Sequence, residues 1–469
     1  MKGDGSLMDD SILERSSLTV KAVIGMASQM AEMNPATIDQ EPAEEAALMI
    51  DSHREHMRYR FAYIMMFVLM SLNDGLIIGY NSYLVAEFTE RKVPSKLRAT
   101  LYVVSLVYFF RMFIGPIADK YYLPWIGKRK TYLIPCKLIA TFLYFTMSFW
   151  IDGLVQNTEI IKITLFFFFL SWIIVFENNS MAGFRVDFFG KNESSAAGAS
   201  ATISLIGGIV LGLQVFNALS SDQICTNYLG LSAALMNHAS LLRCIATINI
   251  IGIAIMFFIE EKGTTDPNTV SSSSRNPLKV IKAMFAVTRL KNIIFFNIIG
   301  PTLVVGLKVA VNQYYWKKWL KKDLHIFALG CVMVPMTIIS NIVWLQITKR
   351  GNLMFLMWIA VIMSVIAESM HIFNHRMFEP GVNDNRTIAI ICILTMGDSL
   401  GNWLIIQGSL FMKAAPSNYA ITFVSTINSV VSASRILPMA IMTTLVDMVT
   451  FEWIIFGSLI AQIIINVST

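Results

Sequence analysis

Apolar runs long enough to cross a lipid bilayer recur along most of the chain, and they constrain its fold more than any other feature. A transmembrane helix needs about 20 mainly apolar residues. Charged residues make up 14% of the chain, against about 25% in soluble domains. The twelve expected spans are 60–86, 97–118, 132–151, 161–184, 196–219, 240–259, 292–314, 325–347, 353–373, 387–412, 419–445 and 450–467. The sequence therefore predicts an all-α membrane protein with twelve transmembrane helices.

The widest connection between these spans separates them into six and six. We expect a polar, disordered cytoplasmic tail over 1–58, an N-terminal six-helix half over 59–260, a central cytoplasmic linker over 261–290 and a C-terminal half over 291–469. Lys and Arg are more frequent on the side that a cytoplasmic N-terminus places in the cytoplasm, which favours that orientation. Two six-helix repeats with a cavity between them are a known transporter plan.

The two halves also share a sequence pattern at a constant offset. A basic loop at Ile126–Lys130 lies between the second and third spans, and another at Ile347–Gly351 lies between the eighth and ninth. The offset between these loops equals the offset between Glu177 and Asp398, which lie in the fourth and tenth spans. The coincidence favours an internal repeat.

A loop with one acid and three bases closes the second span and opens the third. It consists of Asp119 followed by Gly127, Lys128, Arg129 and Lys130. Such a cluster can hold neighbouring helices in one conformation and release them in another. The alternative is that the bases serve only as topology determinants. The spacing resembles the loop motif of the major facilitator superfamily.

Three patches carry a narrower resemblance. They are Asp119, Tyr122, Gly127 to Lys130 and Pro135; then Leu211, Gly212, Phe216, Ala218, Leu219, Ser221, Cys225, Tyr228 and Leu229; and finally Asn428, Val430, Pro438 and Leu445 to Asp447. In these patches the chain resembles the acetyl-CoA transporter family of the endoplasmic reticulum. The resemblance implies a major facilitator fold, alternating access, and import of acetyl-CoA from the cytosol into the lumen of that organelle.

The chain departs from the family pattern in two places. The acid-rich segment of the fourth span here reads Glu177-Asn178-Asn179-Ser180, so one or both of the family's aspartates are lost. The segment before the proline of the eleventh span reads Ser434-Arg435-Ile436-Leu437 instead of Gly-Gly-Asn-Trp. These changes leave open a divergent paralogue that carries another anionic metabolite.

Ionisable residues inside the predicted spans form the candidate site. A charge near the bilayer centre costs about 2.5–3.5 kcal/mol on insertion scales, so it usually faces a wet cavity or a partner. The candidates for contact with the phosphates of the solute, which arginine binds well, are Arg111, Lys308 and Arg435. The intramembrane acids are Asp74, Glu177 and Asp398. These acids either pair internally with the cations or carry a coupling proton. We interpret Lys137 as a residue that snorkels towards the cytoplasm.

Close helix packing is also predicted. Gly75 and Gly79, Gly208 and Gly212, and Gly397 and Gly401 have the G-x-x-x-G spacing that lets two membrane helices approach closely.

Other classes of function are less well supported. His371 and His375 have i, i+4 spacing, but no further histidine completes a local cluster, so we expect neither a metal site nor a cofactor. The sequence contains no phosphate-binding P-loop and no G-x-S-x-G nucleophile motif, so an integral membrane enzyme is only the second alternative. The basic residues form no stripe for nucleic acid. The expected partners are the transported acetyl-CoA or related anion and the lipid bilayer, with a homodimer left open.

Overall fold

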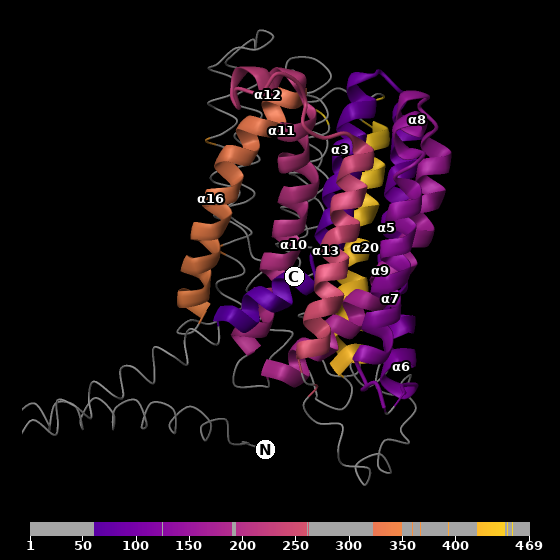
Figure 1. Ribbon diagram of the computed structural model, residues 1–469, viewed down its shortest axis with the longest axis vertical. Coiled ribbons are helices and arrows are strands. Elements are labelled where there is room, and N and C mark those ends of the chain that lie inside the picture. The colour runs from indigo at the N-terminus through magenta and orange to yellow at the C-terminus, as the bar shows by residue number, and fades with distance from the viewer. Residues whose placement is uncertain are drawn as a thin grey trace, which may run out of the picture. The chain divides into compact units, whose positions relative to one another are not determined.

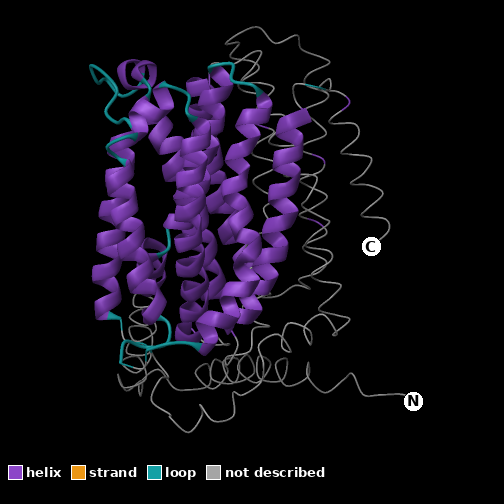
Figure 2. Cartoon of the chain, turned by 90° about the vertical axis from the view of Figure 1, so that its right-hand side faces the viewer, coloured by secondary structure: helices purple, strands orange, loops and turns teal. Residues whose placement is uncertain are grey.

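The computed structural model describes residues 61–123, 125–189, 194–259, 261, 322–348 and 420–445, together with the single residues 359, 366, 393, 448 and 453. Within these residues every regular element is a helix (Figure 2). Contacts divide the chain into a unit of residues 1–63 and a unit of residues 64–469. The predicted tail, the linker beyond Glu261, and the seventh, ninth, tenth and twelfth spans lie outside this description, apart from the single residues.

Helices occupy the other predicted spans. The first is a helix over Phe61–Met70 that bends by 52° into α3 (Asn73–Glu90). The second comprises α4 (Ser95–Ala99), η1 (Thr100–Tyr102), α5 (Val103–Leu106), η2 (Val107–Phe110) and α6 (Arg111–Lys120). The third is α7 (Lys130–Met147), followed by the short α8 (Ile151–Gln156) and the fourth, α9 (Ile160–Phe189). The fifth comprises α10 (Ser194–Ile209), the π-helical η3 (Val210–Val215) and α11 (Phe216–Ser220). The short α12 (Asp222–Asn227) precedes the sixth, α13 (His238–Phe258). The eighth and eleventh are α16 (Lys322–Thr348) and α20 (Ala420–Leu445).

Four of the described helices are long and apolar enough to cross a membrane, and the bent pair that forms the first span is a fifth candidate. Large apolar side chains are exposed on these helices and on α7, among them Phe142 of α7, Phe169 of α9 and Phe257 of α13. Lipid can solvate these rings, whereas the backbone groups are satisfied within the helices. The prediction of an all-α membrane architecture is therefore confirmed. The count of twelve helices stays a prediction.

The glycines of the first and fifth spans allow α3 to lie directly against α10 and η3. A methyl group added at Gly75 would lie 2.1 Å from the backbone oxygen of Leu205, and one at Gly208 would lie 2.5 Å from that of Leu72. No side chain fits at these distances. The predicted close packing is thus confirmed for both pairs of glycines, and Gly397 and Gly401 lie outside the described residues.

Two helices from the second half of the chain pack against the first half. α20 contacts α6, α9 and η2, whereas α16 contacts η3 and α11 (Figure 1). Val424 and Ile427 of α20 belong to the same apolar core as Phe67 and Phe184. These contacts place α20 beside the loop that carries the acid and the three bases.

Candidate functional site

A buried ion pair joins the first and second spans. The Nη2 atom of Arg111 lies 3.1 Å from Oδ2 of Asp74, and both side chains are almost fully removed from solvent. The amide of Asn178 on α9 donates to the same carboxylate. The guanidinium also stacks on Tyr108, with its central carbon 4.5 Å from the ring centre. Arg111, predicted to contact the solute, is therefore paired internally in this conformation.

A second buried pair joins the third and fourth spans. The Nζ atom of Lys137 lies 2.8 Å from Oε1 of Glu177, and the two side chains are 1% and 3% exposed. Asn73 donates to the other carboxylate oxygen at 2.9 Å, and Lys137 donates to Asn249 at 3.3 Å. The interpretation of Lys137 as a snorkelling residue is wrong, because its amine is held inside the bundle by a carboxylate.

A third buried cation, Arg185, was not among the predicted site residues. Its Nη2 atom donates to the hydroxyl groups of Ser71 and Ser204, the latter at 3.2 Å. The predicted fourth span ended at residue 184, whereas α9 continues to Phe189. The signal available in the sequence was the seven-residue spacing from Asn178, which places both side chains on one helix face.

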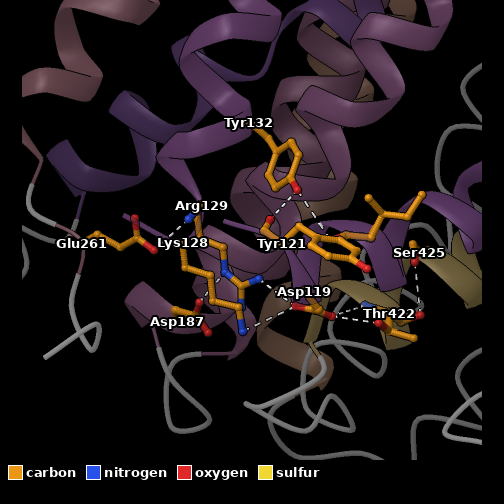
Figure 3. Close-up of polar contacts among 10 residues, drawn as sticks. Asp119, Tyr121, Lys128, Arg129, Tyr132, Asp187, Glu261, Thr422 and Ser425 are labelled. Atoms are coloured by element: carbon orange, nitrogen blue, oxygen red, sulfur yellow. Dashed lines mark hydrogen bonds and ion pairs between the residues drawn. The ribbon is translucent and has the colours of Figure 1, made fainter. Parts of the chain in front are cut away.

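The loop between α6 and α7 forms a compact charge cluster with α9 (Figure 3). The guanidinium of Arg129 bridges two acids, with Nη1 2.9 Å from Asp119 and Nε 2.7 Å from Asp187. The amine of Lys128 lies 3.7 Å from Asp119. We call these four residues and Thr422 the loop cluster. Asp187 was missed by the sequence analysis because it lies beyond the predicted end of its span.

Burial and charge act in opposite directions within the loop cluster. Burial lowers the pKa of Arg129, but the carboxylates of Asp187 and Asp119 outweigh it and raise that pKa above its ordinary value. Burial, followed by the charge of Arg129, lowers the pKa of Lys128. The positive charge of Arg129 is thus stabilised by its two carboxylate partners, whereas that of Lys128 is disfavoured by burial and by Arg129.

The loop cluster extends to the second half of the chain through Asp119. Its Oδ2 atom accepts hydrogen bonds from the backbone N–H and from the hydroxyl of Thr422, both 2.8 Å long. Thr422 lies in the first turn of α20, where backbone N–H groups lack partners within the helix. A further carboxylate, that of Glu261, lies just after α13. It accepts hydrogen bonds from the backbone N–H groups of Arg129 and Lys130 at the start of α7.

Gly127 precedes this helix start and has a φ of +109°, which L side chains rarely adopt. A methyl group there would lie 2.3 Å from a carboxylate oxygen of Glu261. The positive φ is therefore what requires glycine at this turn, because the flexible end of the Glu261 side chain can move away from a methyl group.

Several predicted site residues cannot be placed. Lys308 and Asp398 lie outside the described residues, as do His371 and His375. Arg435 lies on α20, but its side chain is not described. Within the described part of the chain, no group of three potential metal ligands occurs.

The first half of the chain matches a known family. Residues 60–292 match the family described as acetyl-coenzyme A transporter 1. The putative transporter AmpG 4 of Rickettsia conorii is 26% identical over 272 residues, or 56% of this chain and 62% of that protein. An uncharacterized protein of Schizosaccharomyces pombe is 19% identical over 242 residues, or 50% of this chain and 45% of that protein. The chain thus spans less than two thirds of the length of these curated relatives.

Solved structures share the fold. The human organic anion transporter MFSD10 superposes with a TM-score of 0.55 at 11% identity, covering 87% of this chain and 98% of that one. The nucleoside transporter NupG gives 0.55 at 11% identity, covering 86% and 98%. The proton:xylose symporter XylE of the major facilitator superfamily gives 0.50 at 11% identity, covering 87% and 95%. Together with the family match, these likenesses show that this multi-pass membrane protein has the fold of the major facilitator transporters.

Proposed function

Because the chain belongs, through residues 60–292, to the acetyl-coenzyme A transporter family, we propose that it moves acetyl-CoA across an intracellular membrane by alternating access. In this proposal the membrane is that of the endoplasmic reticulum and the N-terminus is cytoplasmic. Transport runs from the cytosol into the lumen. Alternating access takes place within one chain, so the scheme holds equally for a monomer and for a homodimer.

The observation that carries the proposal is the buried pair of Arg111 and Asp74, which lies inside the family-matched segment. A buried cation that loses its only acid is strongly destabilising, so it needs another anion at the moment of separation. The phosphate groups of acetyl-CoA are such anions, and a guanidinium binds them in a bidentate manner. Arg111 therefore exchanges Asp74 for the solute as the bundle switches. Lys308 and Arg435 remain proposed as its counterparts in the second half.

The intramembrane acids have a complementary role in this scheme. When Arg111 turns to the solute, Asp74 keeps the amide of Asn178 as a donor. Glu177 holds Lys137 and Asn73 in the same way. With Asp398, these acids are the candidates for internal pairing or for carrying a coupling proton.

In this proposal the loop cluster holds the bundle in one conformation. Asp119 holds the first turn of α20 while Arg129 holds Asp119 and Asp187. These bonds close the α6–α7 end of the bundle, which the proposed orientation places in the cytosol. They must break for a solute to enter from that side.

The test is uptake of labelled acetyl-CoA into proteoliposomes that contain the purified protein. Saturable uptake that free CoA competes supports the proposal. The Arg111→Gln variant should then lose most of the uptake, whereas Arg243→Gln, at an exposed site beside Phe149, should retain it. Arg435→Gln should also lose uptake without loss of membrane insertion. No uptake by a folded wild-type protein would contradict acetyl-CoA as the solute.

A second candidate is a paralogue that carries another anionic metabolite. The observation in its favour is that Asn178, in a segment where the family pattern is acidic, donates to Asp74 and leaves the site with less negative charge. Counterflow with a panel of CoA esters, nucleotides and peptides separates the two candidates. Exchange of any of these solutes also separates a carrier from a membrane enzyme.

A further inference from the structure

Arg185 differs from the other buried cations of the candidate site. The residue is 2% exposed, and its Nε atom is buried without an acceptor among the described residues. Its hydrogen-bond partners among the described residues are the neutral hydroxyl groups of Ser71 and Ser204. Arg111, Arg129 and Lys137, in contrast, each form an ion pair with a carboxylate. In the described part of the chain, Arg185 has no acid within ion-pair distance.

A charge that is held only by neutral groups inside a membrane protein needs an explanation. Desolvation of a guanidinium is costly, and two hydroxyl groups offset only part of that cost. Asp74 lies three residues after Ser71, but its carboxylate is bonded to Arg111 and Asn178. A cation kept in this state is available to an anion that enters from outside the protein.

The position of Arg185 suits a solute pathway. It lies seven residues after Asn178, or about two helical turns, and two residues before Asp187 of the loop cluster. It therefore stands between the buried Arg111–Asp74 pair and the end of the bundle that the loop cluster closes. Ser71 lies at the 52° bend between the helix Phe61–Met70 and α3. Broken helices border the solute sites of many transporters.

We propose that Arg185 binds a phosphate group of the transported anion. On opening of the bundle, the phosphate oxygens replace the hydroxyl groups of Ser71 and Ser204 and take up the Nε–H donor. A phosphate is the favoured ligand because Nε–H and one Nη2–H lie on the same edge of the guanidinium and fit two of its oxygens. The inference rests on the proposed function, in that it assigns the site at which the solute's phosphates are held.

The test is binding to the purified full-length protein, measured with acetyl-CoA and with acetylated pantetheine, which lacks the nucleotide and all phosphate groups. We expect Arg185→Gln to weaken acetyl-CoA binding at least roughly tenfold and to leave pantetheine binding unchanged. Arg185→Lys keeps the charge but loses the paired donors, so its loss should be smaller. Arg243→Gln removes the same charge from an exposed site and should bind both compounds like the wild type.

Each outcome bears on the inference. Equal affinity of wild type and Arg185→Gln for acetyl-CoA overturns it, as does an equal loss for both compounds. If Arg185→Gln does not purify as a folded protein, the Arg185→Lys variant provides the test. A wild-type affinity of that variant for acetyl-CoA then counts against the inference. If the wild type binds no CoA ester, the proposed function fails separately. The same variants are then titrated with ATP, and the inference falls unless Arg185→Gln weakens that binding.

Discussion

The carboxylate of Asp119 accepts two hydrogen bonds from Thr422, which is 303 residues away in the sequence, and each bond is 2.8 Å long. The other oxygen of the same carboxylate lies 2.9 Å from the guanidinium of Arg129. The first turn of a helix presents unpaired N–H groups and a positive partial charge, so a carboxylate is well placed there. One side chain thus couples the loop cluster to a helix of the second half.

The Asp119→Asn variant should weaken this coupling. The amide cannot pair with Arg129 as an ion and cannot accept every bond that the carboxylate accepts. Arg129 keeps Asp187, so we expect a loss of about 1.5–3 kcal/mol in stability, together with impaired uptake. Thermal unfolding in detergent and proteoliposome uptake measure the two effects. Lys162→Gln, which breaks the exposed pair with Glu159, is the control and should change neither. An unchanged unfolding temperature in Asp119→Asn would count against the coupling.

Substitution of Gly115 should force α6 and α20 apart. A methyl group at Gly115 would lie 2.1 Å from the hydroxyl oxygen of Ser425 and 3.0 Å from the Cα atom of Thr422. The backbone atom cannot yield as a side chain can, so Gly115→Ala should lower the unfolding temperature and slow uptake. Strain from such overpacking costs about 1–3 kcal/mol.

Gly153 provides the matched control for this prediction. It lies in α8, and a methyl group there meets nothing within 4 Å. Gly153→Ala should therefore leave stability and uptake as in the wild type or slightly raise stability. Similar behaviour of the two variants would show that the close approach of α6 and α20 is not needed.

The pair of Lys137 and Glu177 should behave as a unit. Glu177→Gln leaves the amine of Lys137 buried with only neutral partners, and breaking a buried pair costs about 3–5 kcal/mol. The double variant Lys137→Met with Glu177→Leu removes both charges and should recover most of that stability, because apolar replacement of a buried pair is often neutral. The measurement is a double-mutant cycle of unfolding free energies. Additive losses would contradict the pairing of these two side chains.

Glu261 should give the protein a measurable pH dependence of stability. Burial raises the pKa of its carboxyl group above its ordinary value, although the backbone N–H groups of Arg129 and Lys130 act in the opposite direction. A raised pKa in the folded state favours the protonated form. The contribution of Glu261 to stability is therefore full below the pKa of the unfolded chain and is lost as the pH rises through the folded value.

We expect Glu261→Gln to remove this component. The difference in unfolding temperature between wild type and variant should shift in favour of the variant as the pH rises from about 4.5 towards neutrality. Lys162→Gln serves again as the control for general effects of charge. A difference that stays constant with pH would refute the role assigned to burial.

The sequence predicted helix positions well because membrane insertion depends on the hydropathy of about 20 consecutive residues. The predicted span 240–259 and the observed α13 (His238–Phe258) differ only at their ends. The prediction failed at the end of the fourth span, where two charged residues continue the helix. The predicted fourth span ended at 184, whereas α9 reaches Phe189, because Arg185 and Asp187 find buried partners instead of water.

The sequence by itself determined that this chain is an all-α membrane protein, which loop carries the acid and bases, and which glycines permit close helix contact. Only the tertiary structure decided which charges meet. Arg111 and Asp74 are 37 residues apart in sequence, and Asp119 meets the first turn of α20 from the other half of the chain. The hydropathy of a segment depends only on its own residues, whereas an ion pair depends on the distance between two helices. That distance is set by the packing of the whole bundle.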